Sequence, residues 1–118
     1  NQAKIWMPLA NLVRSETYLE DRIVTVTGLD PTLLNLSRRQ GWLSTIKNVN
    51  QINLRSWHEQ GAKYILGSLN WQESYIQINR DNSKSFLKNL SCNEDFLVCP
   101  EKPDYIYLIP LKTLIDDD

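Results

Sequence analysis

The chain has 118 residues, of which 42% are hydrophobic and 23% charged, with 4 glycines and 5 prolines. This composition is typical of one globular domain with a single core, and it excludes disordered and fibrous proteins. The formal net charge of -1 argues against nucleic-acid binding, which needs clustered lysines and arginines. No run of about 18 apolar residues occurs, so we expect no membrane-spanning helix within the chain.

We treat residues 1–118 as one α/β domain. Residues 1–20 are expected to form an N-terminal helical segment, and residues 111–118 a frayed acidic tail. The sequence begins at Asn1 with no initiator methionine and no signal peptide. This start suits a domain excised from a longer protein, which is the interpretation we adopt, although a processed chain would begin in the same way.

The first half of the chain alternates helical and strand patterns. Apolar side chains at helical spacing in residues 5–19 predict an amphipathic helix that begins after Pro8. The β-branched run at 23–27 predicts a strand covered on both faces, as in a parallel sheet. A helix is predicted at 31–40, with its leucines toward the core, followed by a short strand at 42–45.

The second half continues the alternation. Asn48 or Asn50 can cap a helix that runs through His58 and stops at Gly61. The later predicted elements are a strand at 62–66, a short helix at 75–78, a helix at 83–90, a strand at 95–99, a turn at 100–103 and a strand at 104–109. The last two strands are too close in sequence for a crossover, so they should form an antiparallel hairpin.

This alternation of strands and helices predicts right-handed βαβ units. The predicted fold class is therefore α/β. We expect a small three-layer sandwich, with a mostly parallel sheet of about five strands and a C-terminal antiparallel hairpin.

The segment GLDPTLLNLSRRQGW, residues 28–42, is the densest in specific residues. Gly28 suits a tight turn, and the Asp30 side chain can accept hydrogen bonds from the free N–H groups of a helix start. Pro31 suits the first helical position, where no N–H is needed. These residues predict a strand, a turn and a capped helix.

The end of this helix carries Arg38 and Arg39, which suit the negative pole of the helix dipole. Gly41 can leave the helix at positive φ, and Trp42 then re-enters the core. The two arginines are also candidate ligand-binding residues. The sequence leaves two interpretations of these arginines open: they contact an anionic ligand, or they only stabilise the end of the helix.

The sequence offers few candidate catalytic or metal-binding residues. His58 is the only histidine and has no predicted partner on its helical face, so we expect a surface residue rather than a general base. No cluster of His, Cys, Asp or Glu has ligand spacing, which predicts no metal and no cofactor. Neither GxGxxG nor a P-loop follows the first strand, and Asp30 disfavours a phosphate there.

The two cysteines, Cys92 and Cys99, do not form a CxxC motif. If residues 96–99 are an extended strand at ~3.3 Å per residue, the two Cα atoms lie too far apart for a disulfide. We therefore expect two small apolar residues. Their redox state does not follow from the sequence.

Trp71 stands between Asn70 and Gln72 after a predicted strand. In open α/β sheets, ligands bind outside the carboxyl ends of the strands. An aromatic ring beside two amides suits a sugar, so Trp71 is a third candidate ligand-binding residue; a buried core position is the alternative.

The order of these motifs resembles the soluble C-terminal domain of multi-pass bacterial glycosyltransferases related to dolichyl-phosphate-mannose–protein mannosyltransferases. The resemblance covers roughly residues 5–110. The matching residues are Gly28, Asp30, Pro31, Leu33, Leu34, Leu36, Ser37, Arg38 or Arg39, Gly41, Trp42, the run GAKYIL at 61–66 and the closing run DYIYL at 104–108. Such proteins often have an aromatic residue before the leucine-serine pair, where this chain has Asn35.

The resemblance implies a non-catalytic, extracytoplasmic (periplasmic) accessory domain of a membrane glycosyltransferase that uses a polyprenyl-phosphate-linked sugar. The expected partner is the membrane-embedded remainder of the same protein, which carries the catalytic acidic residues. A polyprenyl-phosphate sugar or the acceptor is the ligand it implies. A free-standing α/β ligand-binding or protein-interaction module and a small soluble enzyme remain open as alternatives.

Overall fold

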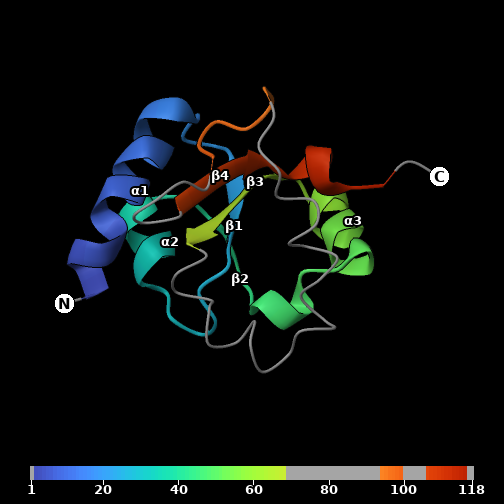
Figure 1. Cartoon of the computed structure of the whole chain (residues 1–118), viewed down its shortest axis with the longest axis horizontal. Helices are drawn as coiled ribbons and strands as arrows, with labels where there is room; N and C mark the ends of the chain where they lie inside the picture. Colours follow the sequence, from blue (N-terminus) through green and yellow to red (C-terminus); the bar gives the residue numbers. More distant parts are fainter. Residues whose placement is uncertain (1, 69–93, 100–105, 117–118) are drawn as a thin grey trace.

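The computed structural model describes residues 2–68, 94–99 and 106–116 (Figure 1). Trp71 and the predicted helices at 75–78 and 83–90 lie outside this part of the chain. The described helices and strands, in order, are α1 (Gln2–Glu16), β1 (Arg22–Thr25), α2 (Thr32–Ser37), β2 (Gly41–Leu43), α3 (Gln51–Glu59), β3 (Ala62–Ser68) and β4 (Ile106–Pro110). Two short 3-10 helices complete the set, η1 (Ile46–Asn48) and η2 (Leu111–Leu114).

The strands form one mixed sheet in the order β2-β1-β3-β4. The first strand, β1, is parallel to β2 and β3, and β4 runs antiparallel to β3 with Ile65 opposite Ile109. The described sheet thus has four strands rather than about five. The predicted strand at 95–99 contributes only an isolated antiparallel bridge between Val98 and Leu108.

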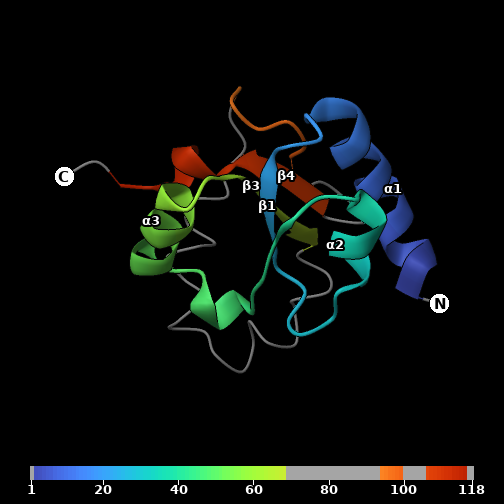
Figure 2. The same cartoon turned by 180° about the vertical axis from the view of Figure 1, so that it is seen from behind.

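Successive strand residues point to opposite faces of the sheet, and each face is covered (Figures 1 and 2). On one side the buried side chains of Ile23, Leu66 and Leu108 join those of α1 and α2 in one cluster. On the other side Val24, Ile65 and Ile109 join residues of η1, α3 and η2. This arrangement confirms the predicted three-layer α/β sandwich.

Helix α1 begins at Gln2 and contains Pro8, whereas the sequence predicts a start after this proline. A proline inside a helix removes one backbone hydrogen bond. Trp6 is fully buried on the preceding turn, as are Leu9 and Val13 further along. Burial of this indole gives the first turn a tertiary anchor, which offsets the cost of the exposed proline.

Helix α2 ends earlier than predicted, at Ser37 instead of about Gln40. Arg38, not Gly41, adopts the left-handed conformation at the helix end, with φ 55°. Gly41 instead opens β2. A Cβ atom at Gly41 would coincide with the carbonyl oxygen of Ile23, so glycine is required there because β2 passes close to β1.

Helix α3 starts at the predicted cap. The Asn50 side chain accepts a hydrogen bond of 2.8 Å from the backbone N–H of Asn53. The alternative cap, Asn48, lies in η1. Gly61 follows the helix at φ +97°, as a glycine stop requires.

Residues 111–116, which the sequence assigns to a frayed acidic tail, pack against α3. Leu111 and Leu114 are buried in η2. The Gln51 side chain donates to the Leu114 carbonyl at 2.8 Å and accepts from the backbone N–H of Asp116 at 2.9 Å. The buried leucines therefore outweigh the acidic composition as far as residue 116.

Cys99 is disulfide-bonded, contrary to the expectation from the sequence. The expectation took 96–99 as an extended strand, but only Val98 pairs with β4. An isolated bridge does not require the whole segment to be extended, so the Cα separation inferred from strand spacing does not hold.

Candidate functional site

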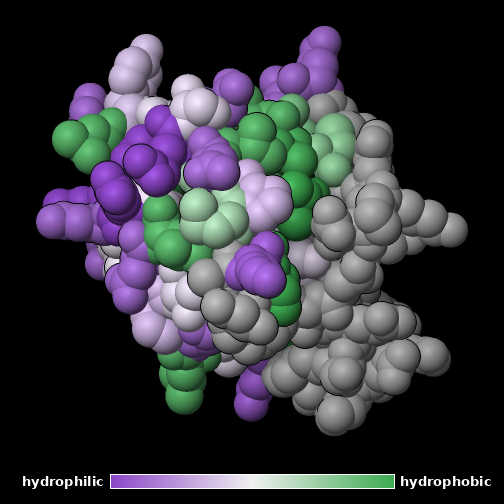
Figure 3. All heavy atoms as spheres, turned by 90° about the vertical axis from the view of Figure 1, so that its left-hand side faces the viewer, coloured by the Kyte–Doolittle hydropathy of each residue, from purple (hydrophilic) through white to green (hydrophobic). Residues whose placement is uncertain are grey.

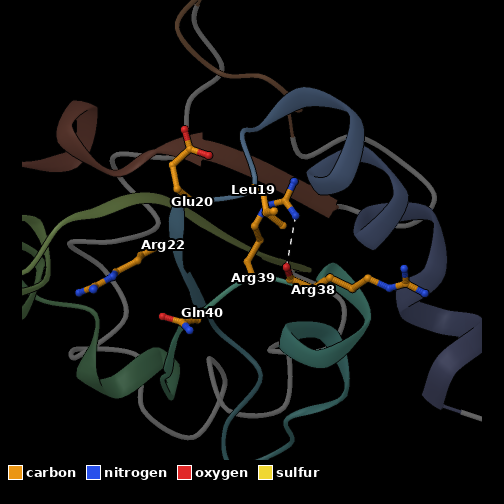
Figure 4. Close-up of a pocket in the computed structure, with 6 residues that line it drawn as sticks. All are labelled: Leu19, Glu20, Arg22, Arg38, Arg39 and Gln40. Atoms are coloured by element: carbon orange, nitrogen blue, oxygen red, sulfur yellow. Dashed lines mark hydrogen bonds between the residues drawn. The ribbon is translucent and has the colours of Figure 1, made fainter.

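A cleft of about 500 Å³, here called the arginine cleft, lies beside the amino ends of β1 and β2 (Figure 4). It is lined by Leu19, Glu20, Arg22, Arg38, Arg39 and Gln40. The cleft brings together Arg38 and Arg39, the two arginines that the sequence pattern indicated, and adds Arg22, which that pattern did not indicate. Ligands of open α/β sheets usually bind outside the carboxyl ends of the parallel strands. This cleft lies at the opposite edge of the sheet.

The Arg39 guanidinium joins the ends of α1 and α2. Its Nε donates to Thr17 Oγ1 at 3.2 Å, its Nη1 to the carbonyls of Ser37 (3.4 Å) and Arg38 (3.2 Å), and its Nη2 to those of Thr17 (3.2 Å) and Arg14 (3.5 Å). A guanidinium has five N–H donors, and each has an acceptor here. These bonds satisfy carbonyls that a helix end leaves free. Arg39 thus joins the end of α1 to the end of α2.

Arg38 and Arg22 are exposed, and their side chains diverge. In Figure 4 Arg22 and Arg38 point to opposite sides of the cleft. Arg22 Nη1 also donates to the carbonyl of Gln60 at 3.1 Å. The described arginines therefore do not converge on one point, as bidentate recognition of a single phosphate would require.

The turn between β1 and α2 is held by its own side chains. Gly28 has φ +67°, and Thr27 Oγ1 donates to the carbonyl of Asp30 at 2.8 Å. Asp30 Oδ1 accepts from the Thr32 backbone N–H at 3.0 Å and from its hydroxyl at 2.6 Å. Pro31 takes the cap position itself. The Asp30 oxygen thus occupies the start of α2, where an incoming anion would bind.

Trp42 is partly buried in β2 and packs against the core cluster that α3 covers. Trp57 of α3 packs against the same cluster. Both rings contribute to the core, which confirms the prediction that Trp42 re-enters it.

His58 is exposed on α3 and lines a second cleft of about 550 Å³ with Asp95, Pro110, Lys112, Thr113 and Ile115. This cleft lies on the α3 side of the sheet, away from the arginines. Within residues 2–68, 94–99 and 106–116, no three His, Cys, Asp or Glu residues are grouped so as to hold a metal ion.

Tyr64 of β3 is a titratable residue that the sequence did not single out. Partial burial raises the pKa of its phenol above the ordinary value of 10.0, and the charge of Asp21 and the nearby Tyr18 add to the effect. The phenol therefore stays neutral to higher pH than a free tyrosine. Asp21 and Tyr18, which act on this phenol, belong to the turn that precedes β1.

The face that carries α1 and α2 is mixed, with hydrophilic and apolar areas side by side (Figure 3). Helical segments in the described part of the chain are all too short or too polar to cross a bilayer.

No protein-family model, no curated protein and no solved structure matches the chain.

Proposed function

We propose that the chain is a non-catalytic, extracytoplasmic accessory domain of a membrane glycosyltransferase that uses a polyprenyl-phosphate-linked sugar. In this proposal the catalytic residues belong to the membrane-embedded remainder of the same protein. The motif resemblance at residues 28–42 and 61–66 supports it. These two segments form the turn after β1, helix α2, the start of β2 and most of β3.

The disulfide bond of Cys99 is the structural observation that supports the extracytoplasmic side. Disulfides form and persist in oxidising compartments and are rare in the cytosol. A domain attached to the outer face of a membrane meets that condition. The same bond would be unusual in a cytosolic module.

The geometry of the described side chains supports an accessory role rather than catalysis. Acid–base catalysis needs paired titratable groups within reach of one substrate atom. The arginine cleft contains a single carboxylate, Glu20, and Arg39 there is engaged with backbone carbonyls. His58 and Asp95 line the other cleft, so it is the side chains of the arginine cleft that favour the accessory role.

The reading frame that encodes this chain tests the proposal. We expect it to contain, upstream of Asn1, a series of apolar segments of about 20 residues each, long enough to span a bilayer. We also expect acidic residues in the loops between them. A reading frame without such segments would refute the membrane glycosyltransferase.

A free-standing ligand-binding or interaction module is the second candidate. The self-contained core favours it, because both faces of the sheet are covered within the chain itself. The same reading frame separates the two candidates. A frame that encodes only this domain would favour the module.

A further inference from the structure

The turn between α1 and β1 holds two large apolar side chains in solvent. Tyr18 is 74% exposed and Leu19 is 75% exposed. The turn is closed by two hydrogen bonds: the Asp21 N–H donates to the Tyr18 carbonyl at 3.0 Å, and Asp21 Oδ2 accepts from the Tyr18 N–H at 2.8 Å. The two side chains are therefore presented on a structured backbone.

Arginines surround this turn. Leu19 lines the cleft together with Arg22 and Arg38. Arg14 is exposed on the last turn of α1, and its carbonyl accepts from Arg39 at the same end of the molecule. The residues that line the cleft include three cations, Arg22, Arg38 and Arg39, and one anion, Glu20. Asp21 closes the turn beside them. The lining therefore keeps a positive balance of charge next to the two apolar side chains.

The spread of the cations distinguishes between kinds of anionic partner. Arg22 and Arg38 diverge in Figure 4, which does not suit a single bound phosphate. A bilayer presents many phosphates in one plane, and it accepts cations spaced around exposed apolar side chains. Tyrosine is itself enriched at the membrane–water interface.

We propose that Tyr18, Leu19, Arg14, Arg22 and Arg38 form a surface, the arginine-turn surface, that lies on an anionic lipid bilayer. Tyr18 and Leu19 sit at headgroup level, and the arginines contact lipid phosphates. This inference rests on the proposed function, since a domain joined to a membrane enzyme is held beside a bilayer. Arg39 takes no part because its donors hold α1 and α2.

Glu20 gives the proposal a test of opposite sign. Its carboxylate lines the same cleft as Arg22 and Arg38. On an anionic surface it is repelled, and the repulsion weakens binding. Glu20→Gln should therefore strengthen binding, while loss of the arginines weakens it.

The experiment is co-sedimentation of the whole chain with vesicles of phosphatidylcholine, with and without phosphatidylglycerol, at low and high salt. The charge variant combines Arg22→Gln with Arg38→Asn, because asparagine tolerates the left-handed backbone at position 38. The apolar variant combines Tyr18→Ser with Leu19→Ser. The matched control combines Lys47→Gln with Leu29→Ser, two exposed positions outside the arginine-turn surface.

We expect the wild-type chain to bind the anionic vesicles and salt to weaken the binding. The charge variant should lose about fivefold in partitioning for each arginine removed. The apolar variant should also bind more weakly, Glu20→Gln should bind more tightly, and the control should match the wild type. Circular dichroism melting should show every variant folded.

Absence of wild-type binding to anionic vesicles at low salt would overturn the inference. So would equal binding by the charge variant and the control, or cross-linking of Leu19→Cys to protein instead of lipid in the intact parent membrane. These results leave the reading frame untouched, so failure here is distinguishable from failure of the proposed function. If the chain binds vesicles but the reading frame lacks upstream apolar segments, only the proposed function is refuted.

Discussion

The Arg39 guanidinium contacts Thr17 twice, at its hydroxyl and at its carbonyl, both at 3.2 Å. Thr17 follows α1, and Arg39 follows α2. One side chain therefore closes the ends of both helices, which form the layer on one face of the sheet.

Replacing Arg39 with alanine should lower the free energy of unfolding by about 2 kcal/mol, because several helix-end carbonyls lose their donor. Lysine should not restore stability, since an ammonium cannot reproduce the planar fork. Urea denaturation measures the change. Arg14→Ala is the control and should shift stability by no more than about 0.5 kcal/mol, its side chain being exposed. Equal stability of both variants would contradict the role assigned to Arg39.

Gly41→Ala should be far more damaging than Gly28→Ala. The new methyl group at position 41 meets the Ile23 carbonyl and forces β2 from β1, at a cost of about 3 kcal/mol. At Gly28 the space is open and only the backbone conformation is strained, which costs about 1 kcal/mol. Thermal melting of the two variants compares them. The reverse order would show that the close approach of β2 to β1 is wrong.

The raised pKa of Tyr64 predicts a loss of stability at alkaline pH. The folded chain holds the phenolic proton at pH values where the unfolded chain has already released it. The unfolded state then binds fewer protons, so stability falls as the pH rises above 10.0. Tyr64→Phe should lose this dependence, while Tyr18→Phe should keep most of it, because burial is the larger cause of the raised pKa of Tyr64. Denaturation curves measured on both sides of that pH decide, and an unchanged slope in Tyr64→Phe would contradict the assignment.

The disulfide of Cys99 should appear in peptide mapping under non-reducing conditions. We expect Cys92 as the partner because it is the only other cysteine of the chain. Reduction or Cys99→Ser should lower stability by about 2 kcal/mol, as for a short closed loop. Ser91→Ala is a neighbouring control that leaves the bond intact. Recovery of two free thiols from the native, unreduced protein would contradict this prediction.

Local patterns predicted much of the fold. The β-branched run that forms β1, the Asn50 cap and the glycine stop at Gly61 each depend on chemistry within a few residues. The alternation of strands and helices likewise depends on short segments. These features therefore follow from the sequence alone.

The features that the sequence missed depend on distant contacts. Pro8 stays helical because Trp6 is buried under tertiary packing. Arg38 takes the left-handed conformation that was predicted for Gly41, because Gly41 lies in β2, where its close contact with Ile23 leaves no room for a side chain. No local pattern contains these constraints.

The candidate site was foreseen only in part. Arg38 and Arg39 do line one cleft, but their different roles follow from which acceptors each guanidinium reaches. Arg22 lines the same cleft because the start of β1 lies beside the end of α2 in space. The spacing of these residues in the sequence does not indicate this. Trp71 lies outside the described residues, and its role as a sugar contact stays a prediction.

The most direct test of the central claim is a topology measurement on the complete parent protein in its own cells. Alkaline phosphatase, which is active only outside the cytoplasm, is fused after Asp118, and green fluorescent protein is fused at the same point in a parallel strain. We expect phosphatase activity in the membrane fraction and no fluorescence. A fluorescent fusion without phosphatase activity, or recovery of the fusion in the soluble fraction, would contradict an extracytoplasmic domain of a membrane glycosyltransferase.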